Sequence, residues 1–310
     1  MLRKPPRLHP RSTIAVVAPA SPIRDAAKLE RGIRYLESLG YRTVVGKSVA
    51  SSDGYLAGSD RLRAEELERY FADPAIGAIF CARGGYGTMR LLDVLDWDTI
   101  ARHPKIVVGF SDITALQWAL LERAGIPSLS GLMVGVDFDD PDPESEALFW
   151  SLLTEPTSER VLWEGAADDR IVSGAATGTL LAGTLTLVAS LCGTPYLPSL
   201  AGCILALEDI GEESYRLDRM LCQLSLASVL PQCAALVFGA FTLDADRRST
   251  TPERPLRTIL GEYVERAGCK PAVMNVPYGH IRGKISLPIG LRAQLDTDRQ
   301  QLVLLESLVV

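Results

Sequence analysis

The chain has 310 residues, of which 47% are hydrophobic, and a formal net charge of −6 at pH 7. That length and composition are enough to bury the core of one large domain or two ordinary ones. The acidic balance, with no basic cluster longer than the N-terminal leader, argues against nucleic acid or an anionic membrane as the main partner. The leader's apolar run, Ile14 to Ala18, is too short for a signal peptide or a membrane span, so we expect a cytoplasmic protein.

Cysteines and histidines offer no metal-binding pattern. The six cysteines form no C-x-x-C pair and most sit in apolar runs, which indicates buried free thiols in a reducing compartment. The three histidines, His9, His103 and His280, have no close partner histidine at a metal-ligand spacing. We therefore expect no metal site.

The first half of the chain alternates strand-like and helix-like patterns. Strands are expected at Ile14–Ala18, Thr43–Val45, Ala78–Cys81 and Ile106–Val108. Helices are expected from Leu29 to Leu39 with Gly40 as C-cap, from Asp60 as N-cap to Phe71, and from Thr88–Leu92 onward. This alternation predicts an α/β domain built on a doubly wound parallel sheet with helices on both faces.

The second half is predicted to be a smaller, mixed and β-rich domain. We expect residues 1–136 to form the N-terminal domain, 137–176 an acidic, proline-broken linker region with one helix at Glu146–Leu153, and 177–310 the C-terminal domain. Further strands are expected at Ile204–Leu207, Ala235–Gly239, Ala272–Val276, Arg292–Leu295 and Leu302–Leu305. Further helices are expected at Leu185–Leu191, Tyr215–Leu226 and Leu256–Ala267.

The segment Gly109-Phe110-Ser111-Asp112 joins a predicted strand directly to a predicted helix. A serine at such a turn lies at the carboxyl edge of the sheet, beside backbone N–H groups that can stabilise an oxyanion. These residue types favour Ser111 as a nucleophile. A plain turn with Asp112 as N-cap is the alternative on this segment alone.

A second unusual turn, Arg83-Gly84-Gly85-Tyr86-Gly87, follows another predicted strand. It has neither the Lys-Ser/Thr of a phosphate loop nor the spacing of a dinucleotide-binding loop. Three glycines in five residues allow close approach of the backbone to a ligand, or a tight structural turn. In a doubly wound sheet both turns should open on the same edge, where ligands bind.

Two further side chains complete a possible catalytic set. Glu208 ends the predicted strand Ile204–Leu207, although the residues alone do not distinguish it from Asp209. His280 stands at the end of an apolar run beside Gly279, as either a structural or a catalytic histidine. Together with Ser111 they give a nucleophile, an orienting acid and a base in chain order. The α/β-hydrolase elbow G-x-S-x-G is missing, because Ile113 stands at its second glycine.

The segments VVGFSDIT, CARGGYG, LALEDIGEESYRLDR and NVPYGH followed by LPIG resemble the murein LD-carboxypeptidase family, which includes microcin-immunity peptidases. The resemblance spans roughly residues 14–290 and implies a catalytic triad of Ser111, Glu208 and His280. It also implies an oxyanion hole made by the backbone amides of Gly85 and Asp112, and a flavodoxin-like N-terminal domain. Such a mechanism requires no cofactor.

The same resemblance implies the substrate: a serine carboxypeptidase that removes terminal D-alanine from murein tetrapeptides, as a cytoplasmic homodimer that recycles muropeptides. A peptidase acting on peptidyl-nucleotide or other amide conjugates is the alternative within this family. A non-catalytic ligand-binding protein is the alternative from another class.

The leaving residue of a carboxypeptidase carries a free carboxylate, which needs a cation or several N–H donors when it is buried. Arg83 is the nearest cation that the sequence places beside the oxyanion turn, and Tyr86 is a second candidate for substrate binding in the same turn. A structural ion pair between Arg83 and an acid of the second domain is the alternative for the arginine.

Overall fold

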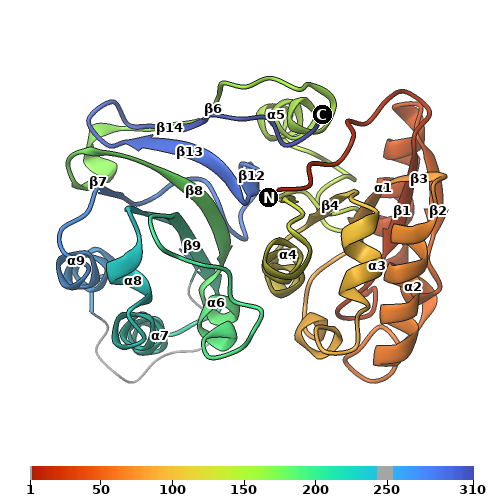
Figure 1. Ribbon diagram of the computed structural model, residues 1–310, viewed down its shortest axis with the longest axis horizontal. Helices are drawn as coiled ribbons and strands as arrows, with labels where there is room; N and C mark the ends of the chain where they lie inside the picture. Colours follow the sequence, from red (N-terminus) through yellow and green to blue (C-terminus); the bar gives the residue numbers. More distant parts are fainter. Residues whose placement is uncertain (1, 243–253) are drawn as a thin grey trace.

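The computed structural model describes residues 2–242 and 254–310 and contains two sheets that lie side by side (Figure 1). The first sheet has the strand order β12-β5-β4-β3-β1-β2. Its strands are β1 (Thr13–Val17), β2 (Arg42–Val45), β3 (Ile76–Cys81), β4 (Ile106–Gly109), β5 (Ser128–Ser130) and β12 (Leu287–Ile289). Strands β2, β1, β3 and β4 run parallel, as predicted, and β5, which was not predicted, continues the parallel set. Strand β12 joins β5 in antiparallel pairing. Because β12 comes from the C-terminal half, both halves of the chain build this sheet.

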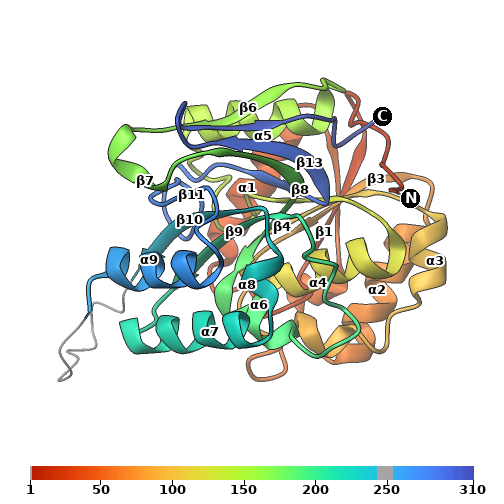
Figure 2. The same ribbon diagram turned by 60° about the vertical axis from the view of Figure 1, so that its left-hand side comes forward.

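Helices cover both faces of the first sheet. They are α1 (Ala26–Ser38), α2 (Asp60–Ala72), α3 (Trp97–Arg102), α4 (Thr114–Ala119) and α5 (Pro143–Thr154). Figure 2 shows α2, α3 and α4 on one side of the strands, with α1 and α5 on the other. Ser59, and not Asp60 as expected, caps α2 by accepting a hydrogen bond from the backbone N–H of Leu62. The segment Thr88–Leu91 forms a single 3₁₀ turn.

The second sheet has eight strands in the order β6-β14-β13-β8-β9-β10-β11-β7 and mixes parallel with antiparallel pairing. Its strands are β6 (Arg160–Glu164), β7 (Arg170–Val172), β8 (Ala175–Thr184), β9 (Ile204–Ile210), β10 (Ala235–Thr242), β11 (Ala272–Val273), β13 (Leu291–Asp296) and β14 (Gln301–Leu304). The accompanying helices are α6 (Leu185–Leu191), α7 (Ser214–Leu226), α8 (Val229–Gln232) and α9 (Leu256–Arg266).

The stretch expected to be a linker contains more regular structure than its composition indicates. Besides α5 it includes β6 and β7, which form the two edges of the second sheet. Edge strands of three to five residues with partly exposed side chains leave only a weak period-two pattern in the sequence. Strand β8 was not predicted either, because its residues are mostly Ala, Gly and Thr and lack a β-branched apolar run.

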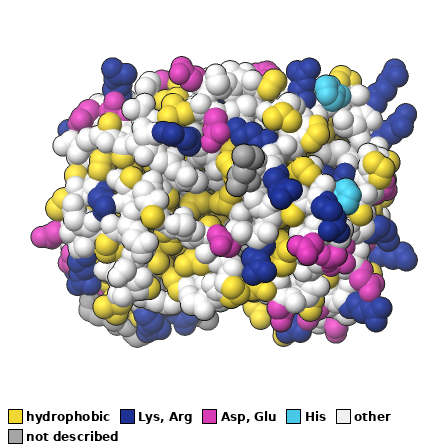
Figure 3. Space-filling model, in the orientation of Figure 1, with side chains coloured by type: hydrophobic (Ala, Val, Ile, Leu, Met, Phe, Trp, Pro, Cys, Tyr) yellow, Lys and Arg dark blue, Asp and Glu magenta, His cyan; other side chains and the backbone are white. Residues whose placement is uncertain are grey.

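The surface shows no concentration of positive charge on the face seen in Figure 3, where Lys and Arg side chains are scattered among Asp and Glu. Within residues 2–242 and 254–310, no helix has the length and apolarity needed to cross a membrane. Over the same ranges, no group of three or more His, Cys, Asp or Glu side chains is arranged to hold a metal ion.

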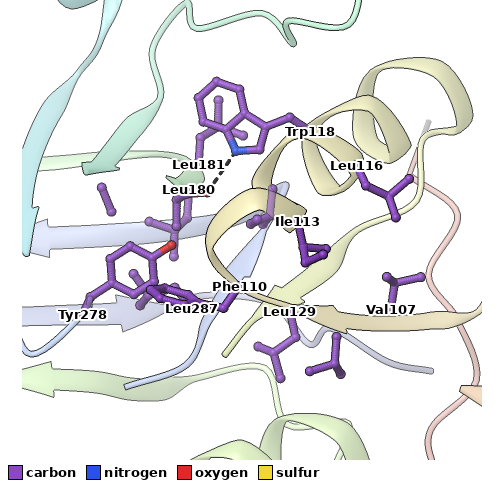
Figure 4. Close-up of a cluster of buried hydrophobic side chains, with 14 of the residues drawn as sticks. Val107, Phe110, Ile113, Leu116, Trp118, Leu129, Leu180, Leu181, Tyr278 and Leu287 are labelled. Carbon is purple, nitrogen blue, oxygen red and sulfur yellow. Dashed lines mark hydrogen bonds between the residues drawn. The ribbon is translucent and has the colours of Figure 1, made fainter. Parts of the chain in front are cut away.

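A buried apolar cluster joins the two halves of the molecule directly beneath the sheet edge (Figure 4). Phe110 and Trp118 enter it from the first half, and Leu181 and Tyr278 from the second. The indole N–H of Trp118 donates to the carbonyl of Ala182 at 2.9 Å. Each large side chain buried in this way stabilises the fold by about 1.5–3 kcal/mol. The cluster therefore holds the two sheets, and the residues at their edges, in a fixed relation.

Candidate active site

Ser111 lies at a tight turn between β4 and α4. Its backbone has φ +65°, a left-handed conformation that is uncommon for a residue with a side chain. The turn is tight enough that a Cβ on Gly109 would lie 2.4 Å from the side chain of Ile113. The 3₁₀ turn Ser111–Ile113 then continues into α4. This geometry lifts the Ser111 hydroxyl out of the sheet edge, where it remains partly exposed.

The structure brings the three sequence-predicted side chains together in one hydrogen-bonded series. His280 Nε2 lies 2.9 Å from Ser111 Oγ, and His280 Nδ1 lies 2.8 Å from Glu208 Oε2. Glu208 is completely buried in β9, whereas the His280 side chain retains 20% exposure. A serine, an imidazole and a buried carboxylate at these distances have the geometry of a hydrolase triad.

The neighbouring acids Glu208 and Asp209 have different surroundings. The second carboxylate oxygen of Glu208 accepts a hydrogen bond from the Thr184 hydroxyl at 2.6 Å, a contact that no local sequence pattern indicates. Asp209 points to the opposite side of the strand and accepts from the backbone N–H and hydroxyl of Thr186, at 2.9 and 2.7 Å. Burial raises the pKa of Asp209 to about 6. Only Glu208 therefore faces the histidine.

Aromatic side chains support the imidazole of His280. The ring of Phe110, the residue before the serine, lies 4.8 Å from the imidazole between centroids. Tyr278 meets Phe110 edge-on at 5.6 Å, and its hydroxyl pairs with Ser130 at 2.8 Å. Because these rings are buried, they fix the imidazole against one wall of the site.

Of the two backbone amides expected to bind an oxyanion, that of Asp112 lies in the serine's own turn and that of Gly85 lies in the glycine turn packed against it. Gly84 approaches so closely that a Cβ there would be 2.8 Å from Ser111 Cβ, and Gly85 follows with φ +119°. The amide of Tyr86 is already used, because it donates to Ser21 Oγ at 3.0 Å. The amides of Gly85 and Asp112 donate to no other group among the described residues. Both can therefore donate to a ligand.

A buried clamp connects the two turns. The Asp112 carboxylate accepts from the backbone N–H of Thr88 at 2.8 Å and from its hydroxyl at 2.7 Å. The Thr88 hydroxyl also contacts the Asp112 carbonyl oxygen. Burial raises the pKa of Asp112, while the Thr88 hydrogen bonds oppose that rise. The fully buried Arg63 guanidinium donates to the Gly87 carbonyl at 3.0 Å and so holds the far end of the glycine turn.

Two cavities meet at His280. One, of about 460 Å³, is lined by Ser111, Gly84, Gly85 and Arg83, among others. The second, of about 500 Å³, is lined by residues of the 132–145 and 280–284 segments, including the ion pair of Lys284 with Asp137 at 2.5 Å. The reactive atoms therefore open into a hollow large enough for a peptide segment.

Of the two residues predicted to bind substrate, Arg83 lines the cavity and Tyr86 does not. Arg83 lines the cavity with Ser111, and its guanidinium donates to the carbonyls of Gly84 and Pro22 at 3.2 and 3.0 Å. Tyr86 points to the surface, is 52% exposed and packs edge-on against Tyr55 at 5.5 Å. It does not line that cavity.

Together, the two-sheet α/β architecture and the serine–histidine–glutamate series define a serine-type hydrolase on a scaffold other than the α/β-hydrolase fold. Comparison with known proteins narrows this class. Residues 14–131 match the LD-carboxypeptidase N-terminal domain and residues 177–295 match the LD-carboxypeptidase C-terminal domain. The chain belongs to this family of serine carboxypeptidases, which confirms the resemblance seen in the sequence.

Similar proteins extend over nearly the whole chain. A putative carboxypeptidase of Streptomyces coelicolor is 38% identical over 98% of this chain and 96% of its own length. A probable murein peptide carboxypeptidase of Bacillus subtilis is 35% identical over 97% and 94%. The microcin C7 self-immunity protein of Escherichia coli is 25% identical over 95% and 93%.

Solved structures show the same two-domain α/β fold. The muramoyltetrapeptide carboxypeptidase from Oxalobacter formigenes has a TM-score of 0.82 and 32% identity, covering 94% of this chain and 97% of that one. The wild-type microcin C7 self-immunity protein has a TM-score of 0.89 at 22% identity, covering 99% and 100%, which is a likeness of fold alone.

Proposed function

We propose that this enzyme is a serine LD-carboxypeptidase that removes the terminal D-alanine of murein tetrapeptides during cell-wall recycling. The observation that carries the proposal is the hydrogen-bonded series from Ser111 through His280 to the buried Glu208. The names of the relatives that process murein peptides give the substrate class.

In the proposed mechanism the Ser111 hydroxyl attacks the scissile carbonyl carbon and its proton passes to His280 Nε2. Glu208 holds the imidazole by Nδ1 and stabilises the imidazolium cation that forms. His280 then gives the proton to the nitrogen of the departing D-alanine, and the C–N bond breaks to leave an acyl-enzyme. Water, deprotonated by His280, hydrolyses the Ser111 ester and releases the tripeptide.

We assign to the amides of Gly85 and Asp112 the role of stabilising the negative charge that develops on the substrate carbonyl oxygen. Their lack of other acceptors among the described residues, and their place in two turns that pack against each other at Ser111, support this role. Donors fixed by a folded backbone need no reorganisation when charge develops, and one such donor contributes about 10²–10³ to kcat.

The test is mass spectrometry of a muropeptide mixture after incubation with the enzyme. The proposal predicts the loss of one alanine residue from tetrapeptides, and a fluorophosphonate probe should label Ser111. Folded protein that neither releases alanine nor reacts with the probe would point instead to a ligand-binding protein.

A second candidate is a peptidase that acts on peptidyl-nucleotide or other amide conjugates. The sequence relationship to the microcin C7 self-immunity protein, 25% identical over 95% of this chain, supports this alternative. The Arg83–Gly87 form of the turn favours the carboxypeptidase branch. Parallel assays with a murein tetrapeptide and an aminoacyl sulfamoyl nucleoside decide between them by the ratio of kcat/KM.

Further features of the proposal concern the setting of the enzyme. The strand order β2-β1-β3-β4-β5 supports a flavodoxin-like description of the first domain. We retain domain limits of 1–136 and 177–310 with 137–176 between them, a cytoplasmic location and a homodimer as predictions. Size-exclusion chromatography with light scattering tests the homodimer. Tyr86 stays a candidate substrate contact by virtue of its place beside Gly85.

A further inference from the structure

We infer that Arg24 and Arg83 together form the binding site for the carboxylate of the leaving residue, and so restrict the enzyme to C-terminal ends. This inference rests on the proposed carboxypeptidase function. It assigns to Arg24, on the loop before α1, a role that the sequence pattern did not indicate.

Covalent geometry limits where such a site can lie. In a terminal residue only three bonds, C–N, N–Cα and Cα–C, separate the scissile carbonyl carbon from the carboxylate carbon. The two carbons therefore lie within about 4 Å of each other. A cation that binds this carboxylate must line the same cavity as Ser111. Among the described residues, the Lys and Arg side chains that do so are Arg24, Lys28 and Arg83.

The three cations differ in whether they already have a carboxylate partner. Lys28 is paired with Asp139 at 3.3 Å. Arg24 forms no ion pair or hydrogen bond with another described residue. Arg83 donates only to the carbonyls of Gly84 and Pro22 and has no carboxylate partner in the described part of the chain, so the structural ion pair considered for it is not observed. Asp25, the acid that lines this cavity among the described residues, accepts a hydrogen bond from the backbone N–H of Lys28 as the cap of α1.

The position of Arg83 is close to the proposed oxyanion site. One of its terminal nitrogens lies 3.5 Å from the point where a Cβ would stand on Gly85. Its bonds to Gly84 and Pro22 fix the guanidinium in place and leave that nitrogen without an acceptor among the described residues. The guanidinium is therefore fixed next to the turn whose Gly85 amide is assigned to the oxyanion.

Two guanidinium groups near each other without an intervening acid repel, and an anion between them relieves the repulsion. Burial and the charge of Arg24 both lower the pKa of Arg83, although a guanidinium stays protonated at neutral pH. Around the charges, Ile23 and Met133 line the same cavity and suit a side chain as small as the methyl group of alanine. The cations of the cavity therefore fit a terminal carboxylate, and its apolar residues fit a methyl side chain.

The experiment compares a tetrapeptide ending in free D-alanine with the same peptide ending in D-alanine amide. Wild-type enzyme should cleave the acid with a kcat/KM at least about 10-fold above the amide, since a charge-assisted hydrogen bond is lost. Arg24→Gln and Arg83→Gln should each lower kcat/KM for the acid by about 10- to 100-fold and reduce the acid-to-amide ratio towards one. Arg24→Lys, which keeps the charge, should recover part of the preference.

Arg34→Gln is the matched control, because Arg34 lies on α1, pairs with Glu30 at 2.7 Å and is exposed. It should keep the wild-type ratio. Arg24→Gln removes no observed contact, so it tests the site even if Arg83→Gln disturbs the turn. If wild type releases no alanine, the proposed function fails. If wild type releases alanine but both Gln variants keep its acid-to-amide ratio, the function stands and the arginine site is refuted.

Discussion

The clamp between Thr88 and Asp112 makes a prediction about how the oxyanion site is held. Thr88→Val keeps the size of the side chain but removes the hydroxyl that donates to the Asp112 carboxylate at 2.7 Å. The backbone N–H of Thr88 remains as a donor at 2.8 Å, so Asp112 stays partly anchored. A hydrogen bond to a charged group contributes about 1.5–3 kcal/mol, which is the expected loss in free energy of unfolding.

The catalytic effect should be smaller than the loss of a whole oxyanion donor, which costs about 10²–10³ in kcat. The Asp112 amide would still be present in the variant but less well fixed, so we expect kcat to fall about 10- to 100-fold. KM should change by less than about threefold, since the clamp stabilises the transition state and not the bound peptide. Steady-state release of alanine and urea unfolding measure the two effects separately.

Thr99→Val is the control, because Thr99 also donates its hydroxyl to a carboxylate, that of Asp96 at 2.6 Å, on the exposed first turn of α3. It should leave kcat unchanged. A Thr88→Val enzyme with wild-type kcat, or one with raised KM and unchanged kcat, would refute the view that this clamp positions the oxyanion donor.

Three further predictions concern the triad and its neighbour. Ser111→Ala should fold normally and lose on the order of 10⁶ in kcat, and a variant that keeps a tenth of the activity would remove Ser111 from the mechanism. Glu208→Gln should be severely impaired, though less than Ser111→Ala, because the amide cannot stabilise the imidazolium. Asp209→Asn should keep near-normal kcat. If Asp209→Asn lowered kcat more than Glu208→Gln, Asp209 and not Glu208 would be the acid that pairs with His280. Since burial raises the pKa of Asp209 to about 6 in the fold, its protonated form stabilises the protein below about pH 4, and that contribution, up to about 3 kcal/mol, is lost as pH rises through 6. Asp209→Asn should reduce the dependence of the unfolding free energy on pH over this range. Urea titrations of both proteins from pH 4 to 7 measure this dependence, and an equal dependence in the two proteins would refute the reasoning.

Sequence reasoning succeeded where the physical signal is local. The inner parallel strands β1 and β4 are buried on both faces, so they appear as short continuous apolar runs that end at turn residues. The turn containing Ser111 could be recognised for the same reason. The expected neighbourhood of Ser111, Glu208 and His280 came from the family resemblance, since their residue types alone left alternatives open.

The features that escaped prediction depend on contacts between distant segments. Thr184 meets Glu208 only because β8 pairs with β9, and β8 has too few apolar residues to be recognised as a strand. The Thr88–Asp112 clamp joins two turns that are adjacent only after β3 and β4 pair. Because the whole fold determines which strands pair, no local sequence pattern predicts either contact.

The strand β12 has a mechanical consequence for catalysis. His280 lies on the segment between β11, which belongs to the second sheet, and β12, which is paired with β5 of the first. His280, the proposed base, therefore lies on a segment anchored to both sheets, whereas Ser111 and Glu208 are each attached to one sheet. Any sliding of one sheet past the other pulls on this segment and changes the 2.9 Å contact between His280 and Ser111. The reactive geometry thus depends on the alignment of the two sheets, which the buried apolar cluster around Phe110 and Trp118 keeps fixed.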